Sequence, residues 1–169
     1  FDMLNRPAIE QIKSLSPNQL NDTTLYTQAA LHLFVEFDDS KESNQKKSVD
    51  QLQKIVDKVG GWCEVAQEPQ TKERQQKLHE SLSTILVEAQ GQSKALPVAE
   101  DICVPVDKLV EFMNMAETLY DEVGLPPAMW GQAGAGVVRM QPVLDLKQTG
   151  DRQKLFKLQD SLYLAAVQL

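Results

Sequence analysis

Alternating apolar and polar residues predict several strands in this chain. The alternation is strict over residues 31–37, where one face of the predicted strand is apolar and expected to be buried: Leu31, Leu33, Val35 and Phe37. Shorter β-rich runs predict further strands over 62–65, 98–104, 128–130 and 137–144. Only a short glycine-rich stretch separates the last two runs, so we expect them to be joined directly, as in an antiparallel pair.

Apolar residues at helical spacing predict helices between these strands. They occur over 45–59, 78–86, 106–123 and 155–169. Two of these helices have a clear end, because Gly60 and Gly124 directly follow the last apolar position and can adopt the left-handed conformation that ends a helix. Helices mixed with directly joined strands predict an α+β domain, with an antiparallel sheet and helices packed on one face.

Length and composition agree with one folded domain over residues 1–169. A chain of 169 residues with 42% hydrophobic and 24% charged residues is ordinary for a globular domain. The net charge of −7 disfavours nucleic acid and anionic membrane surfaces as partners, because both carry negative charge. No apolar run approaches the ~20 residues that cross a bilayer. We therefore expect no nucleic-acid partner, no membrane partner and a cytoplasmic location.

The two cysteines and the two chain ends add to this interpretation. Cys63 and Cys103 stand in apolar stretches, without a second cysteine or a histidine at metal-ligand spacing. We predict both to be reduced thiols in the core, which suits a reducing cytoplasm. The chain begins at Phe1 without an initiator Met, and its last predicted helix reaches Leu169 without a terminating glycine or proline. These ends predict a fragment of a longer chain.

The stretch GQAGAG, residues 131–136, allows two interpretations. A dinucleotide-binding loop places its glycines before a helix, whose N-terminus binds the pyrophosphate. Here a predicted strand follows, and the order is G-x-x-G-x-G rather than G-x-G-x-x-G. A turn between two strands is therefore the better interpretation, with Gly134 and Gly136 at backbone angles closed to other residues.

Several motifs in the C-terminal half occur in the order found in one family of flavoproteins. The run EDICVPVDKLVEF begins at Glu100 and is followed by a helix, by AMWGQAGAGVVR from Ala128, and by PVLD from Pro142. This order resembles the C-terminal or cap domain of FAD-linked oxidases of the D-lactate dehydrogenase and glycolate oxidase type, most specifically over residues 99–169. The resemblance implies a ferredoxin-like α+β fold, and it implies FAD as cofactor, bound mainly by a preceding FAD-binding domain of the same chain.

The chain departs from this family at the glycine turn. Members often read G-H-A-G-D-G-N-x-H there, and the resemblance implies that both histidines face the flavin and, in many members, hold a divalent metal. In this chain Gln132 and Arg139 occupy the two histidine positions. An amide is a poor metal ligand and a guanidinium repels a cation, so we predict no metal site. Neither side chain can act as the base that oxidation of a hydroxy acid requires, so no catalytic residue is assigned.

Three residues of this stretch are candidates for substrate binding instead. We expect Gln132, Gly134 and Arg139 to shape the roof of the substrate pocket. Alternation in the strand after the turn predicts Val138 and Met140 on the core face and Arg139 on the other face, and the family resemblance implies that this other face points at the flavin. A guanidinium there can hold the carboxylate of a small acidic substrate through two parallel hydrogen bonds. A solvent-facing strand arginine is the alternative.

Other polar residues are weaker candidates. Glu100 and Asp101 are adjacent in a predicted strand, so we expect their side chains to point to opposite faces and not to form a paired-carboxylate site. His32 and His79 have no ligand partner four residues away, and we interpret both as ordinary surface or core histidines.

Two functions from different classes fit these observations. The first is the substrate or cap domain of a cytoplasmic FAD-dependent oxidoreductase that acts on a small 2-hydroxy acid of the lactate or glycolate kind. As an isolated fragment such a domain would be inactive, and we expect it to bind no FAD. The alternative is a non-enzymatic α+β module that binds a small molecule or a partner protein.

Overall fold

The computed structural model describes residues 1–15, 28–73, 75–76 and 93–169. The first elements are β1 (Asp2–Asn5), α1 (Arg6–Leu15), β2 (Leu31–Phe34), α2 (Glu42–Lys58), β3 (Lys94–Ala95) and β4 (Ala99–Cys103). After a 3₁₀ turn at Val106–Lys108 come α4 (Leu109–Val123), β5 (Met129–Gln132), a 3₁₀ turn at Ala133–Ala135, β6 (Val137–Met140), β7 (Val143–Leu144) and α5 (Thr149–Val167). Within these ranges, one antiparallel sheet has the order β2-β1-β5-β6-β4, and β3 pairs separately with β7.

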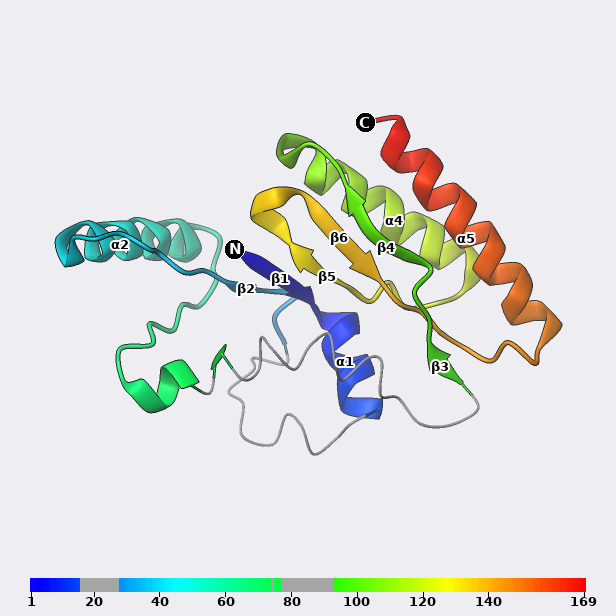
Figure 1. Cartoon of the computed structure of the whole chain (residues 1–169), viewed down its shortest axis with the longest axis horizontal. Coiled ribbons are helices and arrows are strands. Elements are labelled where there is room, and N and C mark those ends of the chain that lie inside the picture. Colours follow the sequence, from blue (N-terminus) through cyan, green and yellow to red (C-terminus); the bar gives the residue numbers. More distant parts are fainter. Residues whose placement is uncertain (16–27, 74, 77–92) are drawn as a thin grey trace.

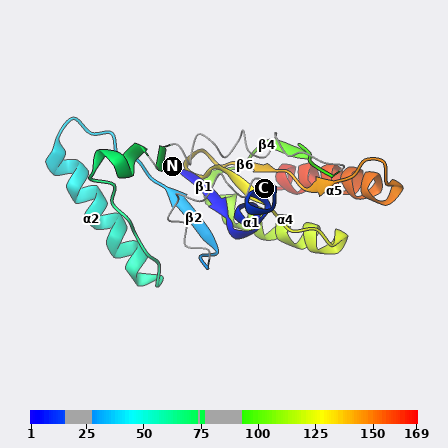
Figure 2. The same cartoon turned by 90° about the horizontal axis from the view of Figure 1, so that it is seen from below.

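Helices α4 and α5 lie side by side over the β4 end of the sheet, on one of its faces (Figure 1, Figure 2). The main core lies between the sheet and these helices. Its strand residues are Met3, Ala99, Ile102, Met129, Val138 and Met140, and its helix residues include Phe112, Ala116, Tyr120, Leu158, Leu162 and Ala165. The predicted α+β domain with an antiparallel sheet is therefore confirmed, and α4 and α5 are the helices packed on this face.

The opposite face of the sheet is called the outer face below. Leu4 and Trp130 follow Met3 and Met129 in their strands, so alternation directs them to the outer face. There they form a second buried cluster with residues of α1: Ala8, Ile9 and Ile12. Among the described helices, α1 is therefore the one that packs on this face, and it does so at one end of β1 and β5.

Asn5 fixes the entry into α1 and joins it to the sheet. Its carboxamide oxygen accepts a hydrogen bond from the backbone N–H of Ala8 at 3.1 Å, as a helix-capping side chain does. The same oxygen accepts from the N–H of Met129 at 2.9 Å, and the amide nitrogen donates to the Pro127 carbonyl at 2.6 Å. One buried side chain thereby ties β1, α1 and the start of β5 together.

The helix predicted over 106–123 is confirmed, with a short 3₁₀ turn before α4. It ends at Gly124, which has the left-handed angle φ +67°. The helix over 45–59 is confirmed as α2, which ends before Gly60. No residue of α2 is buried, and the helix stands apart from the sheet beyond β2 (Figure 1, Figure 2). None of the described helices is long and apolar enough to cross a membrane.

The prediction for the strand at 31–37 is right in position but wrong in its buried face. Leu31 and Leu33 are 40% and 45% exposed. They point to the same side of the sheet as Met3 of β1, which pairs with Leu33, but β2 is the edge strand farthest from β4. Since α4 and α5 lie over the other end of the sheet, they do not cover these leucines (Figure 2). Phe34, on the opposite side, packs against the outer-face cluster instead.

Two other strand predictions need correction, and one helix falls outside the described residues. Residues 62–65 have no regular structure. The run 137–144 is two strands, β6 and β7, because Pro142 between them has no N–H to donate to a sheet. Residues 94–95, which lie outside all the predicted strands, form β3. The helix predicted over 78–86 lies outside the described ranges.

Candidate functional site

The strands β5 and β6 pair directly, which confirms the predicted strand-to-strand connection. In the register of this hairpin, Trp130 lies opposite Arg139, and Gln132 lies opposite Val137. These four residues share the outer face, where Gln132 and Arg139 are diagonal neighbours at a distance of roughly 7–8 Å. Gln132 is exposed and the side chain of Arg139 is 42% exposed. Val138 and Met140 are fully buried on the other face, as predicted.

The glycines of the turn serve close backbone packing, and the predicted special backbone angle is found at Gly136 but not at Gly134. Gly131 and Gly136 have positive φ angles, +151° and +70°, whereas Gly134 does not. A Cβ atom on Gly136 would lie 2.0 Å from the Val104 carbonyl oxygen, and one on Gly131 would lie 2.2 Å from that of Val137. The expectation that Gly134 needs a special backbone angle is therefore wrong.

Gly134 lies against the first residue of the chain. Its N–H donates to the Phe1 carbonyl at 3.2 Å, and a Cβ on it would lie 3.1 Å from the Phe1 Cβ. Gly134 itself is exposed and sits in the 3₁₀ turn, beyond the paired part of the hairpin. The structure thus places Gln132 and Arg139 on one surface and Gly134 at its rim.

The turn does not fit the pyrophosphate of FAD. Its glycines lead into the strand β6 rather than into a helix, so no row of unpaired helical N–H groups faces a phosphate. The outer face does fit the flavin end of the cofactor, because an exposed amide and a half-exposed guanidinium can meet a ring that carries carbonyl and nitrogen acceptors.

A bulge in β4 brings two acidic residues to Arg139. Ala99 pairs with Met140 and Ile102 with Val138, so Glu100 and Asp101 together stand opposite the single residue Arg139. Asp101 has φ +55°, an angle that Asp tolerates better than most residues. Both acidic side chains are exposed on the outer face. The prediction that they point to opposite faces is wrong, because the bulge breaks the alternation.

These acidic residues bond to different partners. The Arg139 Nε–H donates to Asp101 Oδ1 at 2.7 Å, and the Gln141 amide donates to Glu100 Oε1 at 2.5 Å. Gln141 is 4% exposed, and its own Oε1 has no partner among the described residues. The two terminal nitrogens of Arg139 and the side-chain amide of Gln132 likewise have no hydrogen-bond partner among the residues that the structure describes. They remain open to a ligand.

A divalent metal does not fit this donor set. The Gln132 amide is a poor metal ligand, and Arg139 places a positive charge beside the nearest carboxylate, Asp101. Across the ranges that the structure describes, no three His, Cys, Asp or Glu side chains are grouped as a metal site requires.

The cysteines and histidines lie elsewhere or play another part. Both cysteines are free, but Cys103 is exposed and Cys63 is half-buried, so the prediction of core thiols is wrong. Cys103 lies opposite Val137 and therefore on the outer face. His32 is half-buried in β2, opposite Leu4. His79 falls outside the described residues.

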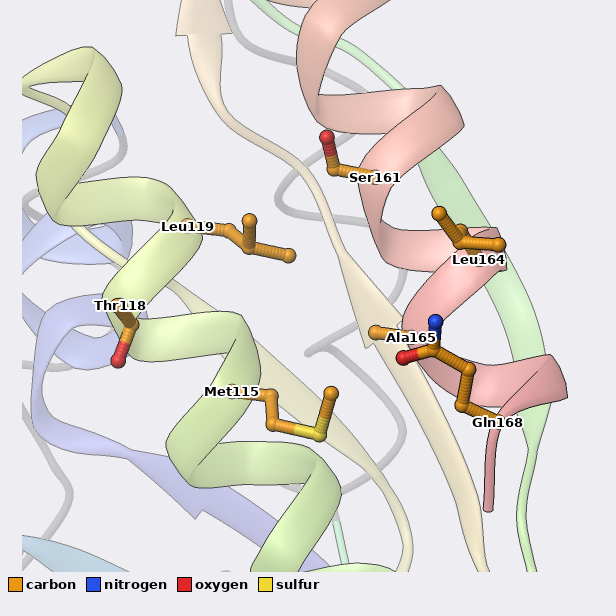
Figure 3. A pocket seen from close by; sticks show the side chains of 7 residues that line it. All are labelled: Met115, Thr118, Leu119, Ser161, Leu164, Ala165 and Gln168. Carbon is orange, nitrogen blue, oxygen red and sulfur yellow. The ribbon is translucent and has the colours of Figure 1, made fainter.

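A shallow groove lies on the helical side of the molecule, between α4 and α5 (Figure 3). Its volume is about 360 Å³, and it is lined by Met115, Thr118, Leu119, Ser161, Leu164, Ala165 and Gln168. None of these side chains titrates or carries a charge. The groove lies on the opposite side of the sheet from Arg139, and it offers no group for chemistry.

The α+β fold agrees with that of a C-terminal domain of FAD-linked oxidases. A family model described as "FAD linked oxidases, C-terminal domain" matches residues 2–169, and the chain belongs to that family.

Several proteins similar to this chain are D-2-hydroxyglutarate dehydrogenases. The one from Escherichia coli (strain K12) is 35% identical over 88 residues, which are 52% of this chain and 8% of that protein. The one from Haemophilus influenzae is 37% identical over 73 residues, 43% of this chain and 7% of that protein. The one from Pantoea ananatis is 30% identical over 78 residues, 46% and 8% respectively. The matched part of the chain thus spans less than a tenth of the length of these relatives.

Sequence reasoning missed the acidic partner of Arg139. Alternation predicts only that Glu100 and Asp101 point to opposite faces, since no residue in the run 98–104 signals a bulge in the way a glycine can. The adjacent carboxylates were themselves visible, and a charged pair opposite a strand arginine was the one available signal.

Proposed function

We propose that this chain is the substrate domain of a FAD-dependent dehydrogenase of 2-hydroxy acids. Its outer face would cover the flavin held by a FAD-binding domain of the same chain. The relatives named D-2-hydroxyglutarate dehydrogenases favour a five-carbon, dicarboxylic 2-hydroxy acid over acids of the lactate or glycolate kind. Both classes of substrate are small and acidic, so they need a cation in the pocket.

The observation that carries the proposal is the placement of Arg139. Its guanidinium lies on the outer face of the β5–β6 hairpin, with both terminal nitrogens open among the described residues. These nitrogens form the planar fork that matches the two oxygens of a carboxylate. Hydrogen bonds to charged groups contribute about 1.5–3 kcal/mol each, enough to fix the substrate's orientation.

The two polar residues would divide the work of holding the substrate. FAD, when bound, takes up the hydride that leaves the carbon bearing the hydroxyl group. Arg139 would bind and orient a carboxylate of the substrate. The exposed amide of Gln132, on the adjacent strand β5, would donate a hydrogen bond to another oxygen of the substrate. Neither side chain accepts the hydroxyl proton, because an amide and a guanidinium are not bases near neutral pH. A group other than these two performs that step.

Steady-state kinetics of the FAD-loaded protein that contains this chain test the proposal. Arg139→Met keeps the length and removes the charge, and we expect it to raise KM for D-2-hydroxyglutarate at least tenfold, the ratio to which ~1.4 kcal/mol corresponds. Lys157→Met is the matched control, since it removes an exposed cation that pairs with Glu122 on the helical side. An unchanged KM in Arg139→Met, with normal turnover, would make Arg139 a solvent-facing residue.

A further inference from the structure

The guanidinium of Arg139 is held at one edge only. A carboxylate can grip an arginine side-on, through Nε and one terminal nitrogen, or end-on, through the two terminal nitrogens. Asp101 Oδ1 lies 2.7 Å from Nε, and the two terminal nitrogens have no partner among the described residues. The side-on edge is therefore occupied from within the protein, and the end-on edge is available.

The backbone of β4 is shaped to make this contact. The bulge places Asp101 opposite Arg139, and the residue keeps φ +55° without being a glycine. Such angles cost free energy and persist where the surrounding structure holds them. The neighbouring carboxylate, Glu100, bonds to Gln141 instead, so Asp101 alone of the two restrains the guanidinium.

We infer that Asp101 is a positioning residue, which fixes the plane of the Arg139 guanidinium so that its terminal nitrogens bind a carboxylate end-on. This inference rests on the proposed function, because it assigns a geometry to the same site. With its plane fixed by Asp101, the Arg139 guanidinium would prefer planar anions with two oxygens over spherical anions. A freely rotating arginine would attract any anion by its charge.

A charge argument makes the opposite prediction, which allows a clean test. Asp101 is negative, so its removal raises the local positive potential and favours every anion, a doubly charged one more than a singly charged one. Positioning predicts instead that removal weakens a dicarboxylate relative to chloride. The ratio of the two affinities therefore separates the two effects by its sign.

The experiment compares D-2-hydroxyglutarate and chloride as probes of the 169-residue chain at constant ionic strength. The backbone amide cross-peaks of the β5–β6 hairpin in ¹H–¹⁵N spectra report both titrations in every variant, and the Arg139 Nε–H cross-peak adds a side-chain readout wherever the arginine is present. Asp101→Gly removes the carboxylate and suits the positive φ angle. Asp101→Asn keeps an acceptor oxygen at an angle that Asn also tolerates. Glu100→Gln is the matched control in the same bulge, and the backbone amide spectrum verifies that each variant is folded.

We expect Asp101→Gly to lower the ratio of D-2-hydroxyglutarate affinity to chloride affinity about threefold, as for an exposed ion pair. It should also speed hydrogen exchange at the Arg139 Nε–H. Asp101→Asn should recover most of the ratio. Glu100→Gln should not lower the ratio, because it removes only a charge and leaves the Asp101 contact to Arg139 in place.

An unchanged or increased ratio in Asp101→Gly would overturn the positioning role. The proposed function fails separately, if Arg139→Met binds D-2-hydroxyglutarate as the wild type does.

Discussion

Replacing Gly136 by alanine tests whether the glycine turn exists for backbone packing. The N–H of Val104 donates to the Gly136 carbonyl at 3.0 Å, and an added Cβ would lie 2.0 Å from the Val104 carbonyl oxygen. Since the Cβ is fixed by the backbone of residue 136 and the carbonyl belongs to the backbone of Val104, no side chain can rotate away to make room. The segment that follows β4 would have to move from the hairpin.

The magnitude has two parts, which a second glycine separates. Alanine in the left-handed region costs about 1–2 kcal/mol. Gly124 has nearly the same angle, φ +67°, with nothing within 4 Å of its Cβ position, so Gly124→Ala shows this part alone. Gly136→Ala adds a backbone displacement, for which overpacking supplies about 1–3 kcal/mol more. We expect Gly136→Ala to reduce the free energy of unfolding by about 2–5 kcal/mol.

Urea unfolding of the two variants, followed by far-ultraviolet circular dichroism, measures the difference. The expected order is wild type, then Gly124→Ala, then Gly136→Ala, with a gap of about 1–3 kcal/mol between the last two. Equal losses in both variants would refute the close contact with Val104. A stable Gly136→Ala chain that no longer binds D-2-hydroxyglutarate would indicate that the glycine serves a ligand instead.

Four further substitutions test the packing on either side of the sheet. Tyr120→Phe should raise the free energy of unfolding by about 1 kcal/mol in urea unfolding, because the Tyr120 hydroxyl is buried without a partner among the described residues. Burial also raises the pKa of Tyr120, so the unfolded state loses the phenol proton first, and the free energy of unfolding should fall as pH rises above about 10. Tyr120→Phe should lack this fall with pH. An equal pH dependence in both proteins would contradict the role of Tyr120. Leu33→Ala should cost about 0.5 kcal/mol or less and Leu4→Ala about 2–5 kcal/mol, since the first is 45% exposed and the second is fully buried; equal costs would place Leu33 in a core. Asn5→Ala should lower the free energy of unfolding by at least about 2 kcal/mol in thermal unfolding, because it leaves two N–H groups and a carbonyl without their partner. A loss below about 0.5 kcal/mol, as is usual for a surface substitution, would show that water replaces the Asn5 side chain.

Local signals predicted the elements that local interactions determine. The helix α4 carries its apolar residues at helical spacing and ends at Gly124, whose left-handed angle the sequence anticipates. The β5–β6 hairpin follows from two apolar runs around a glycine-rich turn. In β6, alternation alone placed Val138 and Met140 in the core and Arg139 on the outer face.

Features that depend on distant parts of the chain could not be predicted in this way. Leu31 and Leu33 form an apolar stripe, but their burial depends on which strands α4 and α5 cover. These helices lie over the β4 end of the sheet and leave the β2 edge uncovered. The Asp101–Arg139 pair depends on a bulge that shifts the register of β4 against β6. The alternation rule assumes a regular strand, so it fails for Glu100 and Asp101 at the one position where the strand is irregular.

The central claim is that the outer face of the β5–β6 hairpin binds the carboxylate of a 2-hydroxy acid. Titration of the ¹⁵N-labelled 169-residue chain with D-2-hydroxyglutarate tests it most directly, because every backbone amide reports its own surroundings. We expect saturable shifts at Trp130, Gln132, Val137 and Arg139, with none along the α4–α5 groove. Shifts confined to that groove, or none on the hairpin at millimolar ligand, would contradict the account.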